Sequence, residues 1–470
     1  MTSPAPPVGG VDALVLNSGR HGPRRIPRAE KLAAIGVCLL LFLEHLAFGG
    51  GRREIALGFA VIQSLTLVGL LIIAPWANQA VARSSALAGP VLLFVATILV
   101  ALWSLTPYVP GGVHPVWTYV AAVPAAAIDK SAVVISLIQL SALACIFLVG
   151  WTLGASETRA RFTLFAFCVC ATAYAVWAFV AHLVDPGLIF GLVPKPQAGR
   201  LLGSFFSANT AGTLFGVSII LIASELVQAL RRWNGEHDRS IERLIRAAAP
   251  PLVGLAFCTV CLILAASRGA LAATVVALCL FIGWEALARK WKLLGAAGAA
   301  LILAVLAIVG LLALGGATFF GRLLDFGRDA AVRQEIVLVH WHAFLASPWM
   351  GYGLGSFDTV NKLLMTGQNY TSLWNIHAAH DVYLQWLEEG GVIGAAPMFA
   401  CLGWLLVTTG AAGFRRSRME TSLRGLTMGS VVILIHGATD YALQVPSISS
   451  MWACLLGLGA GLAATAGRRL

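Results

Sequence analysis

The sequence predicts an all-α membrane protein that crosses the bilayer about twelve times. Of its 470 residues, 59% are hydrophobic and only 11% are charged, and the mean hydropathy is +0.84. Soluble domains carry roughly 25% charged residues, so this chain lacks the polar surface that a water-soluble globule needs. Backbone polar groups must be satisfied internally in a bilayer, which makes each long apolar segment a helix. These observations exclude a soluble cytosolic enzyme.

The apolar segments give the individual helices. A helix needs about 20 predominantly apolar residues to cross the hydrocarbon core. The twelve predicted spans lie near residues 32–48, 56–76, 88–105, 132–153, 162–183, 211–230, 251–266, 270–288, 293–314, 391–412, 425–443 and 447–466.

The distribution of basic residues gives the orientation, because Lys and Arg accumulate in cytoplasmic loops. Residues 1–31 are rich in Pro, Gly and Arg and predict a disordered cytoplasmic tail without a cleavage site. Alternation from this tail places both termini in the cytoplasm, with 22 of the 32 Lys and Arg residues on that side and 10 outside. The net charge of +11 therefore indicates orientation in the membrane rather than a nucleic-acid partner.

The remaining organisation follows from the spans. Residues 32–314 hold predicted transmembrane helices one to nine, residues 315–390 form one large outer loop subdomain, and residues 391–470 hold helices ten to twelve. Within the loop we expect a helix from Asp329 to Leu345 and a glycine-rich turn over 351–355. The nine cysteines all lie in apolar segments and suggest no disulfide framework.

Among the basic residues that fall outside, where the orientation rule disfavours them, three arginines are candidate ligands. Arg200 precedes the sixth span, Arg268 lies in the tight turn between the seventh and eighth spans, and Arg333 belongs to the predicted loop helix. A guanidinium is always charged and presents a planar set of donors that matches phosphate oxygens, so three of them could bind a diphosphate without a metal. Contact with lipid headgroups is the alternative for each arginine taken singly.

The segment that begins at His380 carries the most specific pattern. Its residues His380, Leu384, Leu387, Glu389, Gly391 and Gly394 resemble the signature of the O-antigen ligase and polymerase superfamily. Asp381 departs from the Asn that is usual in this signature. Other pieces follow in the same order as in the family: Arg200, Gly203 and Asn209; Ser267, Arg268 and Gly269; and Arg333 with Pro348, Gly351, Gly353 and Gly355.

The resemblance implies a bacterial inner-membrane glycosyltransferase whose active site faces the periplasm. Its donor would be a glycan on undecaprenyl diphosphate, and its acceptor the lipid A core or a growing glycan. The resemblance further implies that Arg200, Arg268 and Arg333 bind the diphosphate, that His380 removes the acceptor's proton, and that no divalent metal or other cofactor takes part. An imidazole is substantially neutral at periplasmic pH and can therefore act as a general base.

Four further polar residues are candidates with less defined roles. Glu389 could orient His380 in catalysis, cap the tenth span or pair with an arginine. Asn209, Asp381 and Asp440 form a second tier, Asp440 because it lies in the outer part of the eleventh span. Near His380 the acidic groups and histidines do not form a metal-ligand pattern, so we expect no metal site.

The sequence leaves several functions open. Within the enzyme class it does not separate a ligase that acts on the lipid A core from a polysaccharide polymerase or a protein glycosyltransferase, although the span count favours the ligase. A secondary transporter or flippase with twelve spans is the main alternative from another class. A scaffold in a polysaccharide export complex is a third interpretation.

Overall fold

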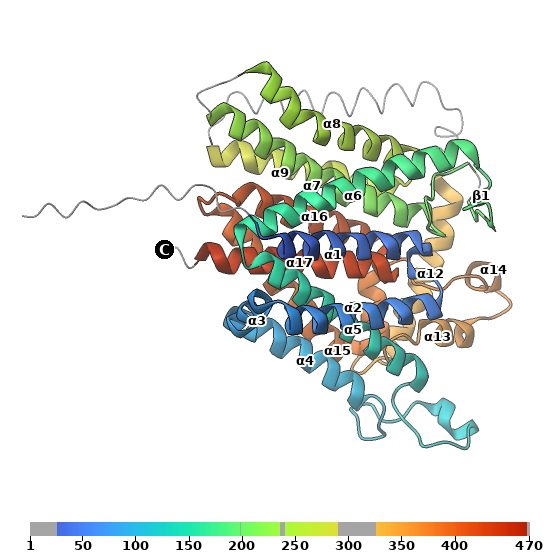
Figure 1. Cartoon of the computed structure of the whole chain (residues 1–470). Coiled ribbons are helices and arrows are strands. Elements are labelled where there is room, and N and C mark those ends of the chain that lie inside the picture. The colour runs from blue at the N-terminus through green and yellow to red at the C-terminus, as the bar shows by residue number, and fades with distance from the viewer. Residues whose placement is uncertain (1–25, 198, 236–239, 290–325, 468–470) are drawn as a thin grey trace, which may run out of the picture.

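A computed structural model describes residues 26–197, 199–235, 240–289 and 326–467 as one bundle of long antiparallel helices (Figure 1). The predicted N-terminal tail falls largely on residues 1–25, which lie outside the described residues. The helices are α1 Arg28–Leu46, α2 Arg53–Ile73, α3 Pro75–Ala82, α4 Ala88–Trp103, α5 Lys130–Gly154, α6 Glu157–Val184, α7 Ala208–Gly235, α8 Ile241–Leu264, α9 Arg268–Arg289, α12 Phe326–Ala346, α13 Phe357–Leu364, α14 Tyr370–Leu373, α15 Val382–Phe414, α16 Glu420–Gly437 and α17 Pro446–Gly467.

Short elements fill the connections between these helices. A small antiparallel hairpin pairs β1 Leu188–Ile189 with β2 Val193–Pro194, in a segment where the sequence predicted only a loop. Four 3-10 turns complete the described elements: η1 Phe48–Gly50, η2 Ser84–Leu87, η3 Pro115–Tyr119 and η4 Ala442–Gln444.

Nine of the described helices are long and apolar enough to cross a bilayer. The predicted spans near 32–48 and 425–443 correspond to α1 and α16, which carry more charged or polar residues and do not meet that criterion. The predicted span 293–314 lies outside the described residues. A multi-pass helical membrane protein is therefore confirmed for the described part of the chain, and the total of twelve spans remains a prediction.

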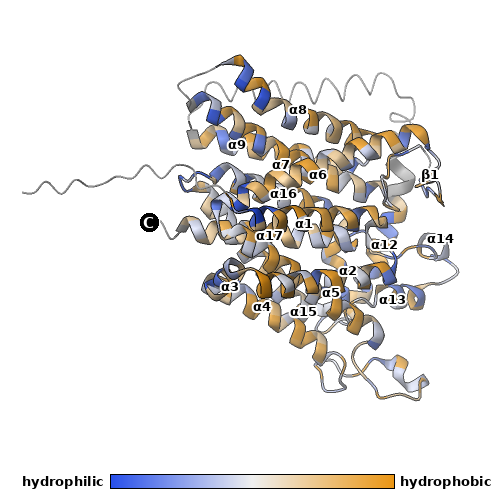
Figure 2. Cartoon of the chain, viewed as in Figure 1, coloured by the Kyte–Doolittle hydropathy of each residue, from blue (hydrophilic) through white to orange (hydrophobic). Residues whose placement is uncertain are grey.

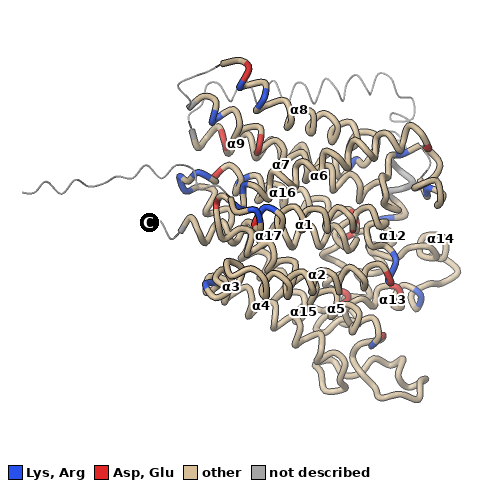
Figure 3. Tube along the Cα trace, viewed as in Figure 1, with Lys and Arg blue, Asp and Glu red and all other residues tan. Residues whose placement is uncertain are grey.

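The surface of the bundle matches a membrane environment. Apolar residues cover the middle of the helices, whereas Lys, Arg, Asp and Glu gather near the two ends (Figures 2 and 3). Large apolar side chains such as Ile73, Leu92 and Val407 point outward and are at least 70% exposed. Helix α7 lies inside the bundle, with contacts to α8, α9 and α16.

The two ends of the bundle differ. Connections 104–129, 185–207, 265–267 and 347–381 gather at one end, which we call the loop end, together with α12, α13 and α14 (Figure 1). The first residue of α1 and the last of α17 lie at the opposite end, which we call the terminal end. The described parts of these connections, which the sequence predicted to lie outside, are thus at one end of the bundle.

Polar caps set where several helices begin. The Asp129 carboxylate accepts from the Ala132 amide at 3.0 Å and starts α5. At the start of α8, the Ser240 hydroxyl accepts from the Arg243 amide at 3.4 Å. Such caps satisfy amides that have no partner within the helix.

Helix α15 extends across the predicted boundary between loop and membrane. The sequence placed the tenth span at 391–412, but the helix starts at Val382 and runs to Phe414. Gly391 interrupts it with φ 58° and ψ −176°, and a Cβ there would lie 2.2 Å from the Trp349 carbonyl oxygen. Two helical halves therefore meet at a kink, where glycine allows both the positive φ and the close backbone contact. The predicted loop helix 329–345 is confirmed as α12.

Helices α5 and α17 make the closest helix contact in the bundle through four glycines. A Cβ at Gly150 or Gly154 would lie 2.1 or 2.2 Å from a carbonyl oxygen of α17, and one at Gly457 or Gly461 would lie 1.9 or 2.5 Å from a carbonyl oxygen of α5. Each helix contributes its pair at the four-residue spacing that lets membrane helices approach backbone to backbone. Any side chain at these positions would force the helices apart.

Candidate active site

The loop that contains Arg200 is hydrogen-bonded to the turn that precedes Arg268. The Arg200 guanidinium donates from Nε to the Ala265 carbonyl at 2.8 Å and from Nη2 to the Ala266 carbonyl at 3.2 Å. The Leu201 amide donates to the Leu264 carbonyl at 3.0 Å. Two arginines that are far apart in the sequence therefore belong to neighbouring loops at the loop end.

A hydrogen-bonded path leads from Arg200 to Asp440. Arg200 Nη2 also donates to Asn209 Oδ1 at 2.9 Å, and Asn209 Nδ2 donates to Asp440 Oδ2 at 2.6 Å. Arg333 of α12 approaches the same carboxylate: its Nη1 donates to the Thr439 carbonyl at 3.2 Å, and its Nη2 lies 3.9 Å from Asp440 Oδ2. Segments of α7, α12 and the α16–η4 connection thus meet at Asp440.

His380 faces this carboxylate from the start of α15. Its Nδ1 lies 3.8 Å from Asp440 Oδ2, which is too long for a hydrogen bond and within range of an ion pair if the imidazole is protonated. The Tyr441 ring packs edge-on against the imidazole, with 5.1 Å between centroids. His380 has φ +55°, a conformation that is uncommon for a non-glycine residue and is found at functional sites.

Asp381 has a local role in placing His380. Its carboxylate accepts from the Tyr383 amide at 2.9 Å and from the Leu384 amide at 3.1 Å, and so caps α15. Asp and Asn are equally good caps. The departure from the usual Asn therefore preserves the turn that presents His380.

His436 is a second imidazole at this place, and the sequence analysis did not identify it as a site residue. Its Nδ1 lies 2.7 Å from the Thr213 hydroxyl, which donates its proton to the Asn209 carbonyl at 3.1 Å. Thr213 has one proton, so His436 Nδ1 acts as the donor between the two side chains. The sequence signal was an ionisable residue at the outer end of a predicted span, four positions before Asp440.

The turn of Arg268 closes the site on the remaining side. Gly269 lies against His436 and Thr439: a Cβ there would be 2.9 Å from His436 Cδ2 and 3.0 Å from Thr439 Oγ1. Arg268 itself is the first residue of α9. We call the following set the polar cluster: Arg200, Asn209, Arg268, Arg333, His380, His436 and Asp440.

Asp440 is fully buried, with 0% of its surface exposed. Burial by itself would raise its pKa, but His380, the charge of His436 and the Asn209 hydrogen bond outweigh burial, and the pKa lies below the ordinary carboxyl value. Asp440 therefore stays negatively charged at neutral pH and can orient the cations and imidazoles around it.

Glu389 points away from the polar cluster. It accepts from the Gly355 amide at 2.8 Å and from Gln385 Nε2 at 2.9 Å, and it is buried. Gln385 in turn accepts from the Ala379 amide at 3.0 Å. The structure thus connects Glu389 with the backbone next to His380 through Gln385, and not with the imidazole.

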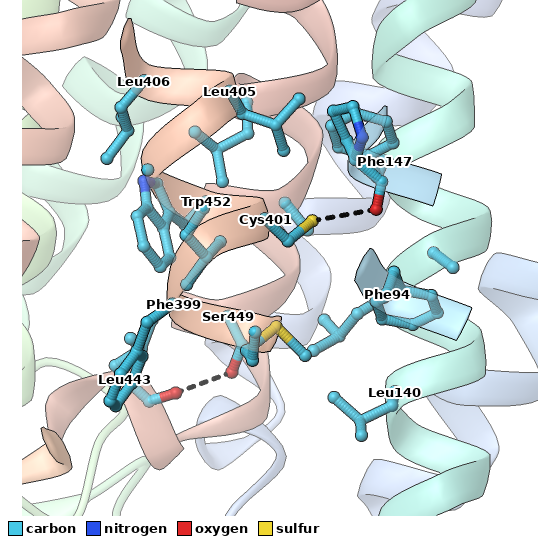
Figure 4. A pocket seen from close by; sticks show the side chains of 18 of the residues that line it. Phe94, Leu140, Phe147, Phe399, Cys401, Leu405, Leu406, Leu443, Ser449 and Trp452 are labelled. Atoms are coloured by element: carbon cyan, nitrogen blue, oxygen red, sulfur yellow. Dashed lines mark hydrogen bonds between the residues drawn. The ribbon is translucent and has the colours of Figure 1, made fainter. Parts of the chain in front are cut away.

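An apolar chamber of about 710 Å³ adjoins the polar cluster (Figure 4). Figure 4 shows side chains of Phe94, Leu140, Phe147, Phe399 and Trp452 around this space. Helices α4, α5, α15, α16 and α17 form its walls.

Residues that line the chamber lie next to residues of the polar cluster in the sequence. The lining residues Val382 and Tyr383 lie two and three positions after His380, and Gly437 and Leu443 lie three positions before and after Asp440. The Tyr383 hydroxyl donates to the Leu434 carbonyl at 2.8 Å and joins α15 to α16 there. A charged site and an apolar volume of ligand size therefore lie next to each other.

Among the residues that the structure describes, no three His, Cys, Asp or Glu side chains lie close enough together to hold a metal ion.

A family model matches part of the chain. Residues 251–399, about a third of the chain, match the family model described as O-Antigen ligase, which confirms the resemblance to the O-antigen ligase superfamily. The matched region contains Arg268, Arg333, His380 and Glu389, whereas Arg200, Asn209 and Asp440 lie outside it. No curated protein matches the chain.

Proposed function

We propose that this chain is a membrane glycosyltransferase of the O-antigen ligase type. It would move a glycan from a polyprenyl diphosphate to an acceptor hydroxyl, at the loop end of the bundle. The observation that carries the proposal is the junction of the polar cluster with the apolar chamber. A polyprenyl diphosphate has the same division between a doubly charged head and an apolar tail.

The chamber suits the tail of such a donor. Its volume of about 710 Å³ lies within the range of ligand pockets, about 300–1,000 Å³. A cavity of about 150 Å³ holds one benzene ring, so the chamber has room for several isoprene units next to the head group. The rest of the tail would extend into the surrounding lipid.

The arginines suit the head group. In the proposed reaction the bond between the anomeric carbon and the diphosphate oxygen breaks, and its electron pair goes to the diphosphate. Arg200, Arg268 and Arg333 would stabilise the negative charge that develops there. Arg200 is already held by three hydrogen bonds, so little reorganisation is needed when the diphosphate binds.

His380 suits the acceptor side. The acceptor oxygen forms a bond to the anomeric carbon and loses its proton, which His380 would accept at Nε2. Its Nδ1 faces Asp440, and that carboxylate would stabilise the imidazolium as it forms, in the way that an aspartate supports the histidine of a catalytic triad. Asn209 fixes Asp440, and Asp381 fixes the turn of His380.

Glu389 has a positioning role in this proposal. It would hold the glycine turn at Gly355 against α15 and, through Gln385, the backbone at Ala379. It would not exchange protons with the substrate. The reaction as proposed needs no metal ion, since arginines and one imidazole supply the charge and the base.

We place the loop end in the periplasm and both termini in the cytoplasm of a bacterial inner membrane. The excess of Lys and Arg in the connections that join the spans at the terminal end supports this orientation. Undecaprenyl diphosphate as carrier and the lipid A core as acceptor follow from the family resemblance. A polysaccharide polymerase is the second candidate, because the same chemistry would serve a growing glycan.

The test uses His380→Ala and Arg268→Ala. We expect both to reduce transfer from a lipid-linked glycan in proteoliposomes by at least about a hundredfold, with normal amounts of protein in the membrane. His342→Ala, an exposed histidine of α12, and Arg246→Ala, an exposed arginine whose side chain is 75% exposed, are the controls. Normal transfer by both test variants would refute the proposal.

Electrophoresis of lipopolysaccharide from a deletion strain separates the candidate activities. Loss of all glycan from the core indicates a ligase, whereas a core that carries a single repeat indicates a polymerase. A flippase would instead leave lipid-linked glycan on the cytoplasmic leaflet.

A further inference from the structure

Two aromatic rings stand exposed and nearly parallel on the loop subdomain. Tyr370 and Trp374 lie four residues apart on and just after α14, with 6.4 Å between ring centroids and 21° between ring planes. Their exposed fractions are 55% and 59%. Each ring thus presents apolar surface to its surroundings.

A buried polar framework holds this pair in place. Asn361 of α13 donates from Nδ2 to the Leu373 carbonyl at 2.8 Å, and Ser372 donates to Glu335 of α12 at 2.5 Å. Asn361 Oδ1 lies 3.3 Å from His340 Nε2, and His340 Nδ1 lies 2.8 Å from Glu388 Oε1 on α15. The backbone under the two rings is therefore connected to α12, α13 and α15, and the rings are preorganised.

The exposed side chains around the rings are mostly polar. Helix α14 projects beyond the ends of the membrane helices, on the side opposite the C-terminus (Figure 1). Most of the neighbouring exposed residues are polar, namely Thr366, Gln368, Thr371, Asn375 and His377, and Leu363 of α13 is an exposed apolar one. Rings that anchor a protein at a bilayer surface have apolar neighbours that enter the lipid, and this group has few.

The ring pair lies within reach of the polar cluster. Trp374 precedes His380 by six residues, a distance of at most about 20 Å along an extended chain. Helix α12 carries both Glu335, which holds α14, and Arg333, which holds the Thr439 carbonyl. A glycan whose reacting end lies at His380 could therefore reach the rings with sugars a few positions away.

We propose that Tyr370 and Trp374 form a stacking site for a pyranose ring of the glycan. The flat, C–H-bearing face of a pyranose packs against an aromatic ring, while its hydroxyl groups point to the rim, where Gln368 and Asn375 offer amide partners. This inference rests on the proposed function, and it adds a site for the sugar chain to the site for the reacting bond.

The binding experiment uses the whole protein in nanodiscs. The probe is the lipid-free oligosaccharide released by mild acid from the lipid-linked glycan of a strain that lacks this protein. We expect it to change tryptophan fluorescence in the wild type and not in Trp374→Ala, with Trp349→Ala as the control because Trp349 is 57% exposed elsewhere in the loop. A second titration with the sugar-terminated acceptor distinguishes donor from acceptor glycan.

The kinetic experiment uses the double variant Tyr370→Ala and Trp374→Ala. We expect the KM for the bound glycan to rise about tenfold and kcat to stay within about twofold, because the rings do not touch the reacting bond. The double change to Phe should restore the wild-type KM, which a purely structural role for the hydroxyl and indole groups would not predict.

Three results would overturn the inference. These are unchanged fluorescence with both glycans, an unchanged KM in the double Ala variant, and quenching of Trp374 by brominated lipids instead of glycan, which would identify a membrane anchor. Failure of the proposed function would give a different result. His380→Ala would then transfer glycan at the full rate, whether or not the oligosaccharide bound in the fluorescence titration.

Discussion

Replacement of Asp440 by Asn tests the electrostatic arrangement of the site most directly. Asn keeps the shape and can still accept a hydrogen bond from Asn209, so the change removes charge and little volume. At 3.8 Å from His380 Nδ1, a full charge pair is worth about 4 kcal/mol with an effective dielectric constant of about 20. His380 is 22% exposed on its side chain, and we expect about half of that energy, about 2 kcal/mol, to act on the imidazolium.

This energy corresponds to a loss of about thirtyfold in the rate of transfer. The reason is that the proton taken from the acceptor would no longer be balanced by a carboxylate. The assay is transfer in proteoliposomes at saturating donor from pH 5 to pH 9.

Titration of Asp440 itself does not shape the pH–rate profile of the wild type near neutral pH. Its pKa is lowered in the folded state, so its contribution to stability is present above the ordinary carboxyl pKa of about 3.9 and is lost as the pH falls through the lowered value. Asp358→Asn, which removes an exposed carboxylate paired with His377, is the control. If Asp440→Asn transfers glycan as fast as the control, Asp440 has no part in the reaction.

Three further predictions concern other parts of the site. Arg200→Lys should lower transfer by about thirtyfold, since an ammonium group cannot bond Ala265, Ala266 and Asn209 in the same geometry; equal rates would contradict this role. Gly391→Ala should lower the stability by about 3 kcal/mol, visible as a lower Tm in detergent, and an unchanged Tm would show that the Trp349 carbonyl can move aside. Ala144→Trp should fill the apolar chamber and raise the KM for donor about tenfold at constant kcat, and an unaltered KM would place the donor tail elsewhere.

The helices could be predicted from the sequence because, in a lipid bilayer, the length and apolar content of a segment are nearly sufficient to identify a membrane-spanning helix. The start of α15 shows where that criterion is incomplete. Gln385, Glu388 and Glu389 make its first turns polar, so hydropathy assigns them to the loop. Their polar atoms are buried by contacts with Gly355 and His340, which no local pattern contains.

The site could be predicted in part. Motifs of the family, together with arginines on the side where the orientation rule disfavours them, predicted Arg200, Arg268, Arg333 and His380 as site residues. The structure brings these residues or their turns to Asp440 or its neighbours. His436 was not identified, because its partners Thr213 and Gly269 come from two other helices.

The direction in which the Glu389 side chain points could not be predicted from the sequence either. The residue stands in the same signature as His380, and adjacency in a signature suggests a common task. Glu389 lies on α15 whereas His380 precedes that helix, so only the packing against the glycine turn at Gly355 decides where the carboxylate points.

The glycine contacts between α5 and α17 bear on how a long lipid could enter and leave. These two helices form one wall of the apolar chamber, and backbone atoms already touch across their seam, so that wall is mechanically stiff. Helices α4 and α15 instead meet through side chains, since a Cβ at Gly89 would lie 2.8 Å from the Trp404 ring. Entry and exit of a polyprenyl chain would then take place between other pairs of the wall helices, and sequence changes there would alter turnover without altering the chemistry.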